Sequence, residues 1–528
     1  MIGISFVSAS LQAAYEKAEK LLGCSRDQII LERDEDVLDT WFSSGLFPFS
    51  VFGWPDNTDD LKAFYPTSLL ETGLDILFFW VARMVMMGLQ LTDQLPFHTV
   101  FLHAMVRDKE GRKMSKSLGN VIDPLEVIKG CSLETLQGRL TGGNLPHKEM
   151  ERAKNNMQEE FPDGIPECGS DALRFGLLAY TVQGRDINLD VKRVVGFRNF
   201  CNKLWNVIKF ALNIVDDFSP TADLLGDLMS SGKMAIRDKN MISKLMTAVE
   251  KVNDCLDNYR FGDAQQAAHS MWMDDLCQVY IELIKPVVYD KSSDNESARW
   301  AAQATLWVCL DVGLRMLHPM MPFVTEELWQ RLPGRGTLGP NESTSIMVAK
   351  YPECNDEYKD ARSEESMATT MKVIAACRSL RASYNIVDKK QTHFYVKISG
   401  SGETDIANQV DDIKTLAKAS AVDINAPEDS IPQTVGTVII DEQTTLMMDL
   451  KGLVDYEAEI KRLNKTLKGT LPVLTKLETT IAAPGYTENA AETLQQENQE
   501  KLEGLQKKKA DIEEAIANFE RLALLDKS

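Results

Sequence analysis

Five consecutive residues of the chain combine cationic and hydroxyl groups in an arrangement that suits phosphate chemistry. Lys113, Met114, Ser115, Lys116 and Ser117 follow one another between two nearby glycines. Phosphoryl and nucleotidyl transfers are catalysed mainly by positioning and by neutralising charge on phosphate oxygens, which two ammonium groups on a mobile loop can do. The spacing predicts a phosphate-binding loop with Lys113 and Lys116 as catalytic cations. A solvated Lys/Ser surface loop is the alternative explanation.

A histidine precedes this loop and invites a catalytic interpretation. His103 ends the apolar run that begins at Phe97, and a general base there is chemically reasonable. A single histidine beside a strand end is more often a structural residue with its hydrogen bonds satisfied. We therefore leave His103 outside the predicted catalytic set.

The elements that must position the loop have an α/β pattern. Residues 35–125 alternate short apolar runs with helical ones, and Phe97–His103 is typical of a buried strand that leads to the loop. This pattern predicts the second half of a doubly wound nucleotide-binding sheet, in which ligands bind beyond the carboxyl ends of the strands. Residues 1–34 carry no motif that places them, and 126–195 form a connecting region. Its stretch from Thr141 to Gly169 is rich in Gly, Pro, Asn and charged residues, which predicts a surface insertion.

The rest of the chain is predicted to be mostly helical. Apolar residues recur at spacings of three and four through 196–335, which predicts an all-α bundle. A linker and a small mixed α/β domain follow over 336–450, with a helix from Val373 to Ser383 and strands at His393–Ile398 and Thr437–Ile440. Heptad-spaced apolar residues over 451–528, interrupted at Pro484, predict an antiparallel coiled coil.

Composition restricts the class of protein and of partner. A chain of 528 residues predicts several domains, and nine scattered cysteines without a Cys-x-x-Cys pair favour a reducing, cytoplasmic compartment over a disulfide framework or a zinc site. The apolar run from Ile76 to Leu91 is interrupted by Arg83 and is shorter than the ~20 residues that cross a bilayer, so a buried helix and no membrane contact are predicted. The start of the chain lacks the basic region of a signal peptide.

The net charge of −20 argues against a nucleic-acid partner, because Lys and Arg contacts to phosphates supply much of the affinity for RNA. Charge distribution can override that total. Lys461, Arg462, Lys465 and Lys468 begin a stretch that contains no acidic residue before Lys476. This stretch is a candidate RNA-binding surface, and a solvated face of a coiled coil is the alternative.

Several longer motifs occur in the order found in one enzyme family. The lysine loop resembles the second signature of class I aminoacyl-tRNA synthetases, and the motifs around it resemble the valyl-tRNA synthetase family. The motifs are Asp36–Gly45, Glu71–Met84, Gly184–Asp190, Phe200–Asn206 and His318–Trp329. The resemblance runs from about Asp34 to near Phe519 and matches only the C-terminal half of the family. The family's first signature, its proline-rich turn and its editing domain have no counterpart.

The resemblance implies roles for particular residues. It implies that Lys113, Met114, Ser115, Lys116 and Ser117 contact the phosphates of ATP, which would arrive with Mg²⁺. No carboxylate cluster marks a dedicated protein site for that metal.

The remaining site residues also have ordinary structural explanations. The resemblance implies that Gly73 and Asp75 contact the adenosine ribose, although an aspartate at a helix start is often only a cap. It implies that Trp41, Ile76 and Trp80 line a small pocket for valine, although core packing is the usual role of such residues.

Three functions follow as hypotheses. The first is a valine-tRNA ligase whose partners are valine, ATP, tRNA(Val) and other translation factors, with no DNA or membrane. Here the helical domain 196–335 binds the anticodon region and the basic stretch binds the tRNA body. The second is a catalytically inactive module that binds tRNA or docks with another synthetase fragment. A coiled-coil scaffold with a degenerate enzyme core ranks last, because the residues of the lysine loop are intact.

Overall fold

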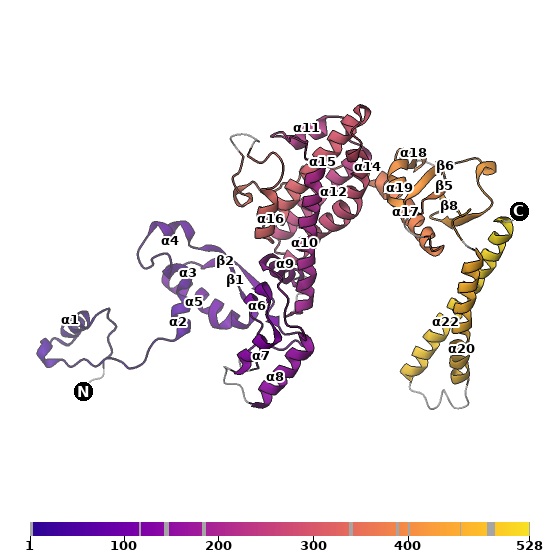
Figure 1. Ribbon diagram of the computed structural model, residues 1–528. Helices are drawn as coiled ribbons and strands as arrows, with labels where there is room; N and C mark the ends of the chain where they lie inside the picture. The colour runs from indigo at the N-terminus through magenta and orange to yellow at the C-terminus, as the bar shows by residue number, and fades with distance from the viewer. Residues whose placement is uncertain are drawn as a thin grey trace. The chain divides into compact units, whose positions relative to one another are not determined.

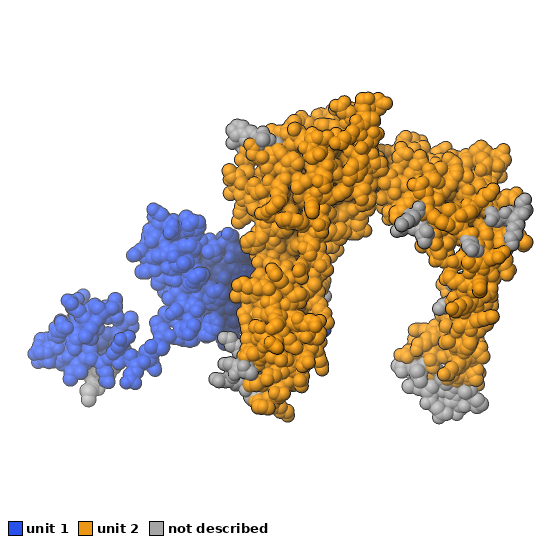
Figure 2. Space-filling view, viewed as in Figure 1, with its two compact units in different colours: residues 1–113, 183–189 blue, residues 114–182, 190–528 orange. Residues whose placement is uncertain are grey.

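A computed structural model of the chain describes residues 4–115, 118–141, 147–181, 186–336, 342–386, 390–399, 402–454, 456–482 and 492–526. These residues divide into two compact units, coloured separately in Figure 2. The first consists of 1–113 with 183–189, and the second of 114–182 with 190–528. Each unit is described by itself.

The first unit is built around a parallel strand pair. Its β1 (Thr67–Gly73) and β2 (Phe97–His103) are hydrogen-bonded neighbours whose last residues, Gly73 and His103, lie opposite each other. The connection consists of a 3₁₀ turn η2 (Leu74–Ile76), a π-helical turn η3 (Leu77–Val81) and α5 (Ala82–Thr92). This β–α–β arrangement agrees with the predicted α/β class, although β1 itself is not evident from the sequence.

The other elements of this unit are short. The N-terminal segment, for which the sequence gives no motif, contains a regular helix that is capped by Ser10 and ends at Gly23. The elements are α1 (Leu11–Leu22), η1 (Arg26–Gln28), α2 (Thr40–Gly45), α3 (Phe47–Ser50), α4 (Asp59–Phe64), and the parallel pair β3 (Val106–Arg107) and β4 (Ile187–Asn188).

The predicted burial of strand 97–103 and of the helix after Ile76 is wrong within this unit. Phe78 is 81% exposed and Met86 is 69% exposed, and most residues of β2 are exposed or half-buried. Val81, Met84 and Phe97 form a small buried apolar cluster at the strand pair. Two strands and one helix are too few to bury both faces of a sheet, so the second face remains open to solvent.

One helical stretch among the described residues, Leu74–Thr92, is long and apolar enough to cross a membrane by length and composition alone. Its mean hydropathy is 1.6, and 17% of it is buried. The sequence predicted that this run, interrupted by Arg83, is too short to span a membrane. By length alone, the helical stretch is long enough. The stretch nevertheless packs through Val81 and Met84 on the strand pair, as a sheet-covering helix does.

The second unit begins with four helices and continues as a helical bundle (Figure 1). The first four are α6 (Pro124–Lys129), α7 (Leu133–Thr141), α8 (His147–Glu160) and α9 (Ser170–Tyr180). The bundle elements are α10 (Val191–Ile214), α11 (Leu224–Ser230), α12 (Ile236–Asp257), α13 (Phe261–Ser270), the π-helix η4 (Met271–Tyr280), α14 (Ile281–Tyr289), η5 (Ser293–Asn295), α15 (Glu296–Leu317), α16 (Pro322–Trp329), η6 (Ile346–Val348) and η7 (Asp356–Tyr358).

The predicted surface insertion from Thr141 to Gly169 contains a helix among its described residues. Its main element is α8, which packs against α7. Met150, Ala153 and Met157 recur at helical spacing, and Ala153 is buried. The polar residues between them hide this periodicity in the sequence.

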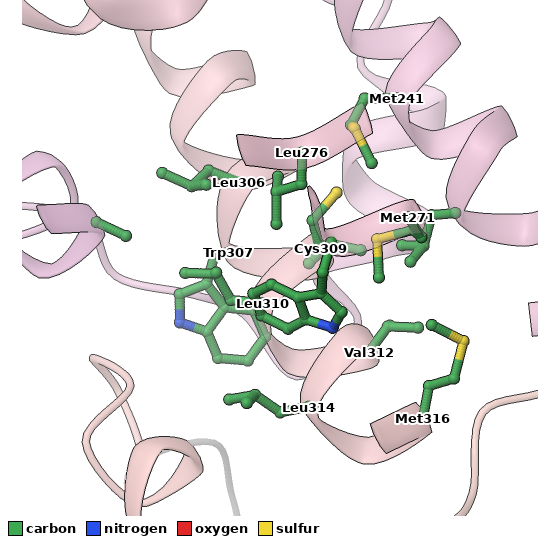
Figure 3. Close-up of a cluster of buried hydrophobic side chains, with 14 of the residues drawn as sticks. Met241, Met271, Leu276, Leu306, Trp307, Cys309, Leu310, Val312, Leu314 and Met316 are labelled. Carbon is green, nitrogen blue, oxygen red and sulfur yellow. The ribbon is translucent and has the colours of Figure 1, made fainter. Parts of the chain in front are cut away.

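The core of the bundle surrounds α15, whose residues from Ala301 to Leu317 are almost all buried. Figure 3 shows Leu306, Leu310 and Leu314 of this helix among side chains that include Met271 and Leu276 of η4. A helix that is apolar on every side belongs in the middle of a large domain, which is the position that α15 occupies. The predicted bundle is therefore confirmed as a packing unit.

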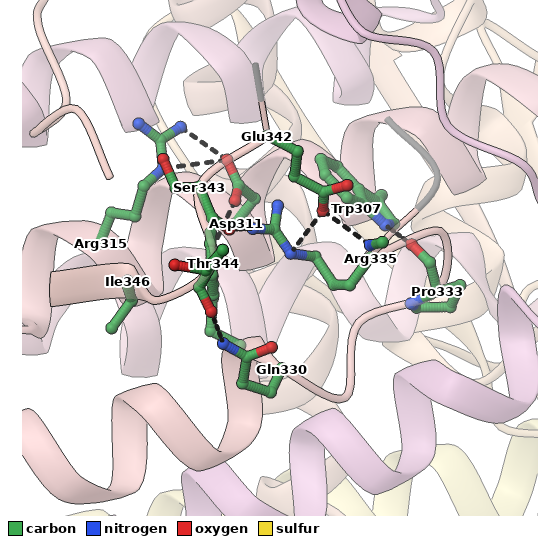
Figure 4. Close-up of polar contacts among 12 residues, drawn as sticks. Trp307, Asp311, Arg315, Gln330, Pro333, Arg335, Glu342, Ser343, Thr344 and Ile346 are labelled. Carbon is green, nitrogen blue, oxygen red and sulfur yellow. Dashed lines mark hydrogen bonds and ion pairs between the residues drawn. The ribbon is translucent and has the colours of Figure 1, made fainter. Parts of the chain in front are cut away.

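Polar groups at the end of α15 form a network of hydrogen bonds and ion pairs (Figure 4). Asp311 accepts hydrogen bonds from Trp329 Nε1 at 2.7 Å and from Arg315 Nη2 at 2.6 Å. Arg335 lies over the Trp329 ring and forms an ion pair with Glu342 at 3.2 Å. These contacts hold the segment after α16 on the bundle, because each buried charge has a partner.

A half-buried carboxyl in the π-helix η4 is expected to make the stability of the bundle depend on pH. Burial raises the pKa of Asp275 to about 6, Lys244 opposes this, and Asp274 and Glu364 add to it. The folded state therefore binds a proton more tightly than the unfolded state, whose carboxyl has a pKa near ~4. Stability should fall as the pH rises from about 4 to about 6 and stay level above that.

We expect Asp275→Asn to remove this dependence and to stabilise the protein at pH 7 by on the order of 2 kcal/mol. The measurement is urea unfolding followed by tryptophan fluorescence at several pH values. Asp257→Asn, at an exposed position of α12 that does not act on Asp275, is the control. Equal stability profiles for Asp275→Asn and wild type would show that the folded state does not hold this proton.

A four-stranded mixed sheet follows the bundle, with strand order β6-β5-β8-β7. The predicted strands are confirmed as β5 (Thr392–Ile398) and β7 (Val435–Ile439), and β6 (Ala419–Ile424) and β8 (Thr444–Asp449) complete the sheet. The helices of this domain are α17 (Ala361–Ser383), α18 (Gly402–Ala407) and α19 (Val410–Ala417), with η8 (Glu428–Ser430). The helix predicted from Val373 thus begins twelve residues earlier, at Ala361, where Asp360 caps it.

The last two helices, α20 (Tyr456–Ile481) and α22 (Glu492–Asp526), pack on each other along their length (Figure 1). The rings of Tyr456 and Phe519 lie 6.3 Å apart, and Gln506 donates a hydrogen bond to Glu478 at 3.3 Å. These pairs show that the helices run antiparallel. The predicted turn at Pro484 lies outside the described residues.

Candidate nucleotide site

The carboxyl ends of β1 and β2 bring polar residues together in the first unit. Gly73 and His103 end the two strands side by side, and His103 Nδ1 lies 2.7 Å from Glu71 Oε1. Ligands of doubly wound sheets bind at this edge. His103, which stands outside the predicted catalytic set, thus lies at this edge with its ring bonded to Glu71. Its register opposite Gly73 is not evident from the sequence.

Gly73 leaves room at the centre of this edge. A Cβ atom at this position would lie 2.8 Å from Asp75 Oδ1, 2.9 Å from Met105 Sδ and 3.6 Å from His103 Nε2. The first two distances are shorter than ordinary contacts, so a Cβ atom at this position would displace the ends of the Asp75 and Met105 side chains. Asp75 is the second residue of η2, and its side chain is exposed. The carboxylate is thus available to an external partner.

Lys113 is held next to Asp75 by a tight hairpin. Asp108 accepts hydrogen bonds from the backbone N–H of Arg112 at 2.7 Å and from its Nε at 2.8 Å. The Asp108 carboxylate also raises the pKa of the Arg112 guanidinium. Gly111 makes the turn with a φ of +78°, which glycine adopts readily. The backbone of Lys113 forms an isolated antiparallel β-bridge with Arg107. The Lys113 Nζ atom lies 3.4 Å from Asp75 Oδ2.

The remainder of the lysine loop is only partly described. Met114 and Ser115 are half-buried, and the Ser115 backbone N–H donates to Asn120 Oδ1 at 2.9 Å. Lys116 and Ser117 lie outside the described residues. The structure therefore brings Gly73, Asp75 and Lys113 together.

The three residues predicted to line a pocket lie in neighbouring elements of the first unit. Trp41 is in α2, Ile76 ends η2 and Trp80 is in the π-helical turn η3. Trp80 Nε1 donates to the Ser44 carbonyl oxygen of α2 at 2.9 Å, and the Trp41 ring lies 5.9 Å from that of Phe79. All three side chains are half-buried. They are neither core residues nor free surface residues.

The basic residues predicted to bind RNA lie on α20. Lys461, Arg462, Lys465 and Lys468 are all exposed. Arg462 forms an ion pair with Glu459 at 2.8 Å, one turn before it. Among the described residues, no group of three or more His, Cys, Asp or Glu side chains is arranged to hold a metal ion.

Gly73 provides a test of this edge as a nucleotide site. We expect Gly73→Ala to weaken the binding of a fluorescent ATP analogue about tenfold, because the new Cβ displaces the Asp75 carboxylate and the Met105 sulfur. The unfolding midpoint should change little, since both displaced atoms are at the ends of flexible side chains. Gly138→Ala is the control, because a Cβ there meets no atom within 4 Å. Unchanged affinity in Gly73→Ala would exclude this edge as the nucleotide site.

Three family models match the chain in sequence order. Residues 5–190 match the class I tRNA synthetases for isoleucine, leucine, methionine and valine. Residues 238–396 match the anticodon-binding domain of tRNA ligases, and residues 455–520 match the tRNA-binding arm of valyl-tRNA synthetases. The first match includes most of the N-terminal segment for which the sequence gives no motif.

The relatives that match nearly the whole chain are valine–tRNA ligases. This chain is 45% identical over 524 residues to a valine–tRNA ligase of Rattus norvegicus, and the match covers 98% of this chain and 41% of that protein. This chain is 42% identical over 497 residues to "Valine–tRNA ligase, mitochondrial 1" of Arabidopsis thaliana, and the match covers 93% of this chain and 44% of that protein. Among solved structures, a leucyl-tRNA synthetase complex of Agrobacterium radiobacter K84 matches with 17% identity and a TM-score of 0.42. The match covers 68% of this chain and 41% of the leucyl-tRNA synthetase chain.

The chain thus spans less than half the length of these curated relatives. The matched models cover its catalytic-type region, its helical region and its last helices. On this identity and this order of matches, the chain belongs to the valyl-tRNA synthetase family of class I aminoacyl-tRNA synthetases.

Proposed function

We propose that the chain acts as part of a valine-tRNA ligase, which joins valine to ATP as valyl-adenylate and transfers the valyl group to tRNA(Val). The observation that carries the proposal is the meeting of Gly73, Asp75 and Lys113 at the carboxyl ends of β1 and β2. A carboxylate, an open glycine position and an ammonium group are what a ribose and its phosphates need from one wall of a nucleotide site.

In this proposal Asp75 accepts hydrogen bonds from the ribose hydroxyls, and Lys113 exchanges its ion pair with Asp75 for the phosphates of ATP. Both side chains are accessible enough for that exchange, at 45% and 70% exposed. Met114, Ser115, Lys116 and Ser117 complete the phosphate contacts. Mg²⁺ would be held by the phosphates of ATP, which suits a metal that keeps several waters and few protein ligands.

Trp41, Ile76 and Trp80 form the valine pocket in this proposal. The hydrogen bond from Trp80 to Ser44 fixes its indole against α2, which supports a rigid wall. Rigid aromatic walls favour small side chains, because they cannot move to admit an extra carbon atom. Trp80→Ala should therefore extend the range of activated amino acids toward larger ones.

We propose two tRNA-binding surfaces. The helical bundle over 196–335 binds the anticodon region. The helices α20 and α22 form a coiled-coil arm that binds the tRNA body. The exposed positions of Lys461, Lys465 and Lys468 support the second surface, since exposed cations can reach phosphates. We place the protein in the cytoplasm, although three matched relatives are named as mitochondrial. We expect other translation factors among its partners.

A second candidate function is favoured by the open apolar face of the first unit. Exposed Phe78 and Met86 lie on the side of the helix that the strand pair does not cover. Exposed apolar surface of this kind commonly marks a docking site. In this alternative the chain is catalytically inactive by itself and binds tRNA or docks with another synthetase polypeptide.

One experiment separates the two functions. Attachment of radiolabelled valine to a tRNA(Val) transcript and binding of the same transcript are measured side by side with the purified chain. The ligase proposal predicts both charging and binding. Binding without charging, by protein that is folded by circular dichroism, would select the docking function and count against ligase activity by this chain.

A further inference from the structure

The outer edge of β6 in the small mixed domain is unpaired. The strand order is β6-β5-β8-β7, so β6 is an edge strand with β5 as its one neighbour in the described sheet. Residues 397–454, which include β6, α18 and α19, lie between the family models that match 238–396 and 455–520. The matched models therefore assign no role to this edge.

The backbone of β6 presents hydrogen-bonding groups along this edge. The N–H of Asn425, just after the strand, donates to the Val396 carbonyl oxygen of β5 at 2.9 Å, so the backbone groups of Asn425 and Asp423 are turned toward β5. Alternate residues of a strand direct their backbone groups to opposite sides. Val422 and Ile424 therefore direct their N–H and C=O groups outward, and neither N–H donates to another residue that the structure describes.

A hollow that encloses about 450 Å³ lies along the same edge. Val422 and Asp423 both line it, and consecutive side chains of a strand point to opposite faces of a sheet, so the hollow lies at the edge itself. Ala407 and Val410, at the turn between α18 and α19, and Pro427, after β6, add apolar lining. The edge thus offers apolar contacts as well as open backbone groups.

The surroundings of the hollow are acidic. Residues 402–430 carry seven acidic and two basic side chains. Asp423 Oδ2 lies 2.7 Å from His393 Nε2, and the Asp423 side chain is 50% exposed. Asp429 is exposed next to Ser430, which lines the hollow, and within the described residues Asp429 belongs to no ion pair. This acidic rim attracts a cationic partner and repels both RNA and a second copy of a chain whose net charge is −20.

We propose that the outer edge of β6 binds an extended segment of a partner protein in which apolar residues alternate with lysine or arginine. The segment is about as long as the six residues of β6 and joins the sheet as an added strand, bonded to the backbone of Val422 and Ile424. Its apolar side chains contact Ala407 and Val410, and its cations lie near Asp423. The inference is independent of the ligase proposal, which gives this domain no role.

The probe is a fluorescent hexapeptide in which lysine and valine alternate, and binding to the full chain is measured by fluorescence anisotropy. We expect binding that weakens with added salt, because exposed charges are screened. The same peptide with glutamate in place of lysine should bind about tenfold more weakly. Two further peptides carry N-methyl groups on all valines or on all lysines. Because an added strand pairs with β6 through the N–H groups of alternate residues, one methylated peptide should lose binding and the other should keep it.

Variants of the chain test the named residues. Ile424→Pro removes an outward N–H at a sheet edge, where proline is tolerated, and should weaken binding of the lysine peptide about tenfold. Ile424→Val keeps the N–H and is its control. Asp429→Lys should weaken binding of the lysine peptide and strengthen binding of the glutamate peptide. Asp257→Lys, the same change at an exposed position of α12, should do neither.

Three results would overturn the inference. The first is equal affinity for the lysine and glutamate peptides, and the second is equal affinity for the unmodified peptide and both methylated ones. The third is a homodimer in sedimentation that Ile424→Pro dissociates, because a second copy would then occupy the edge. Circular dichroism checks the fold of each variant. If Ile424→Pro does not fold, the methylated peptides and Asp429→Lys decide the result.

Discussion

Replacing Lys113 by alanine is expected to slow the formation of valyl-adenylate by about 10²–10³-fold, the usual cost of removing one group that stabilises charge in a transition state. The hairpin closed by Asp108 and Arg112 fixes the position of Lys113 beside Asp75, so no neighbouring lysine can replace it. Lys116→Ala should have an effect of the same size. The measurement is the rate of pyrophosphate exchange at saturating valine and ATP.

Lys109→Ala is the control for Lys113→Ala. Lys109 is an exposed lysine in the same hairpin turn, and its loss should leave the exchange rate within about twofold, as expected for a surface substitution. If Lys109→Ala and Lys113→Ala lose activity equally, the loop acts through its overall charge and not through a positioned ammonium group.

Replacing Asp412 by alanine is expected to lower the free energy of unfolding by about 3–5 kcal/mol. Asp412 of α19 and Arg237 of α12 form a buried pair at 2.7 Å, with side chains 6% and 14% exposed. Burial raises the pKa of Asp412 although Arg237 opposes this, so the pair itself contributes little net stability. The cost of Asp412→Ala arises because it leaves the Arg237 charge buried and unpaired.

Urea unfolding measures this effect, and Asp411→Ala is the matched control. Asp411 is the preceding residue, its side chain is 91% exposed and it pairs only at the surface with Lys414. Its loss should cost well under 1 kcal/mol. The double variant Arg237→Met with Asp412→Leu should recover most of the lost stability. A double variant as unstable as Asp412→Ala would show that the pair is required for more than charge balance.

The elements with a strong pattern could be predicted from the sequence, and the contacts between distant elements could not. The strand Phe97–His103 and the helical bundle follow from apolar spacing. The strand Thr67–Gly73 is preceded by a proline and contains only a short apolar run, so the sequence does not predict it. The helix at 147–160 is not evident from the sequence, because its few apolar residues lie among many polar ones.

Contacts between distant residues could not be predicted at the candidate site either. Gly73, Asp75 and Lys113 could be proposed because the spacing of their motifs resembles a known family. The hydrogen bond between His103 and Glu71, which are 32 residues apart in the sequence, depends on the pairing of their strands. No local sequence pattern predicts it. The π-helical turn that carries Trp80 also escapes prediction, because periodicity distinguishes π from α winding poorly over five residues.

Exchange of labelled pyrophosphate into ATP by the purified wild-type chain, with valine and then isoleucine as the amino acid, tests the proposed function most directly because it needs no tRNA. The nucleotide site at Gly73, Asp75 and Lys113 predicts exchange that depends on valine, is far weaker with isoleucine and disappears in Lys116→Ala. No exchange by a folded chain that still binds tRNA(Val) would contradict autonomous adenylate formation and leave binding as its function.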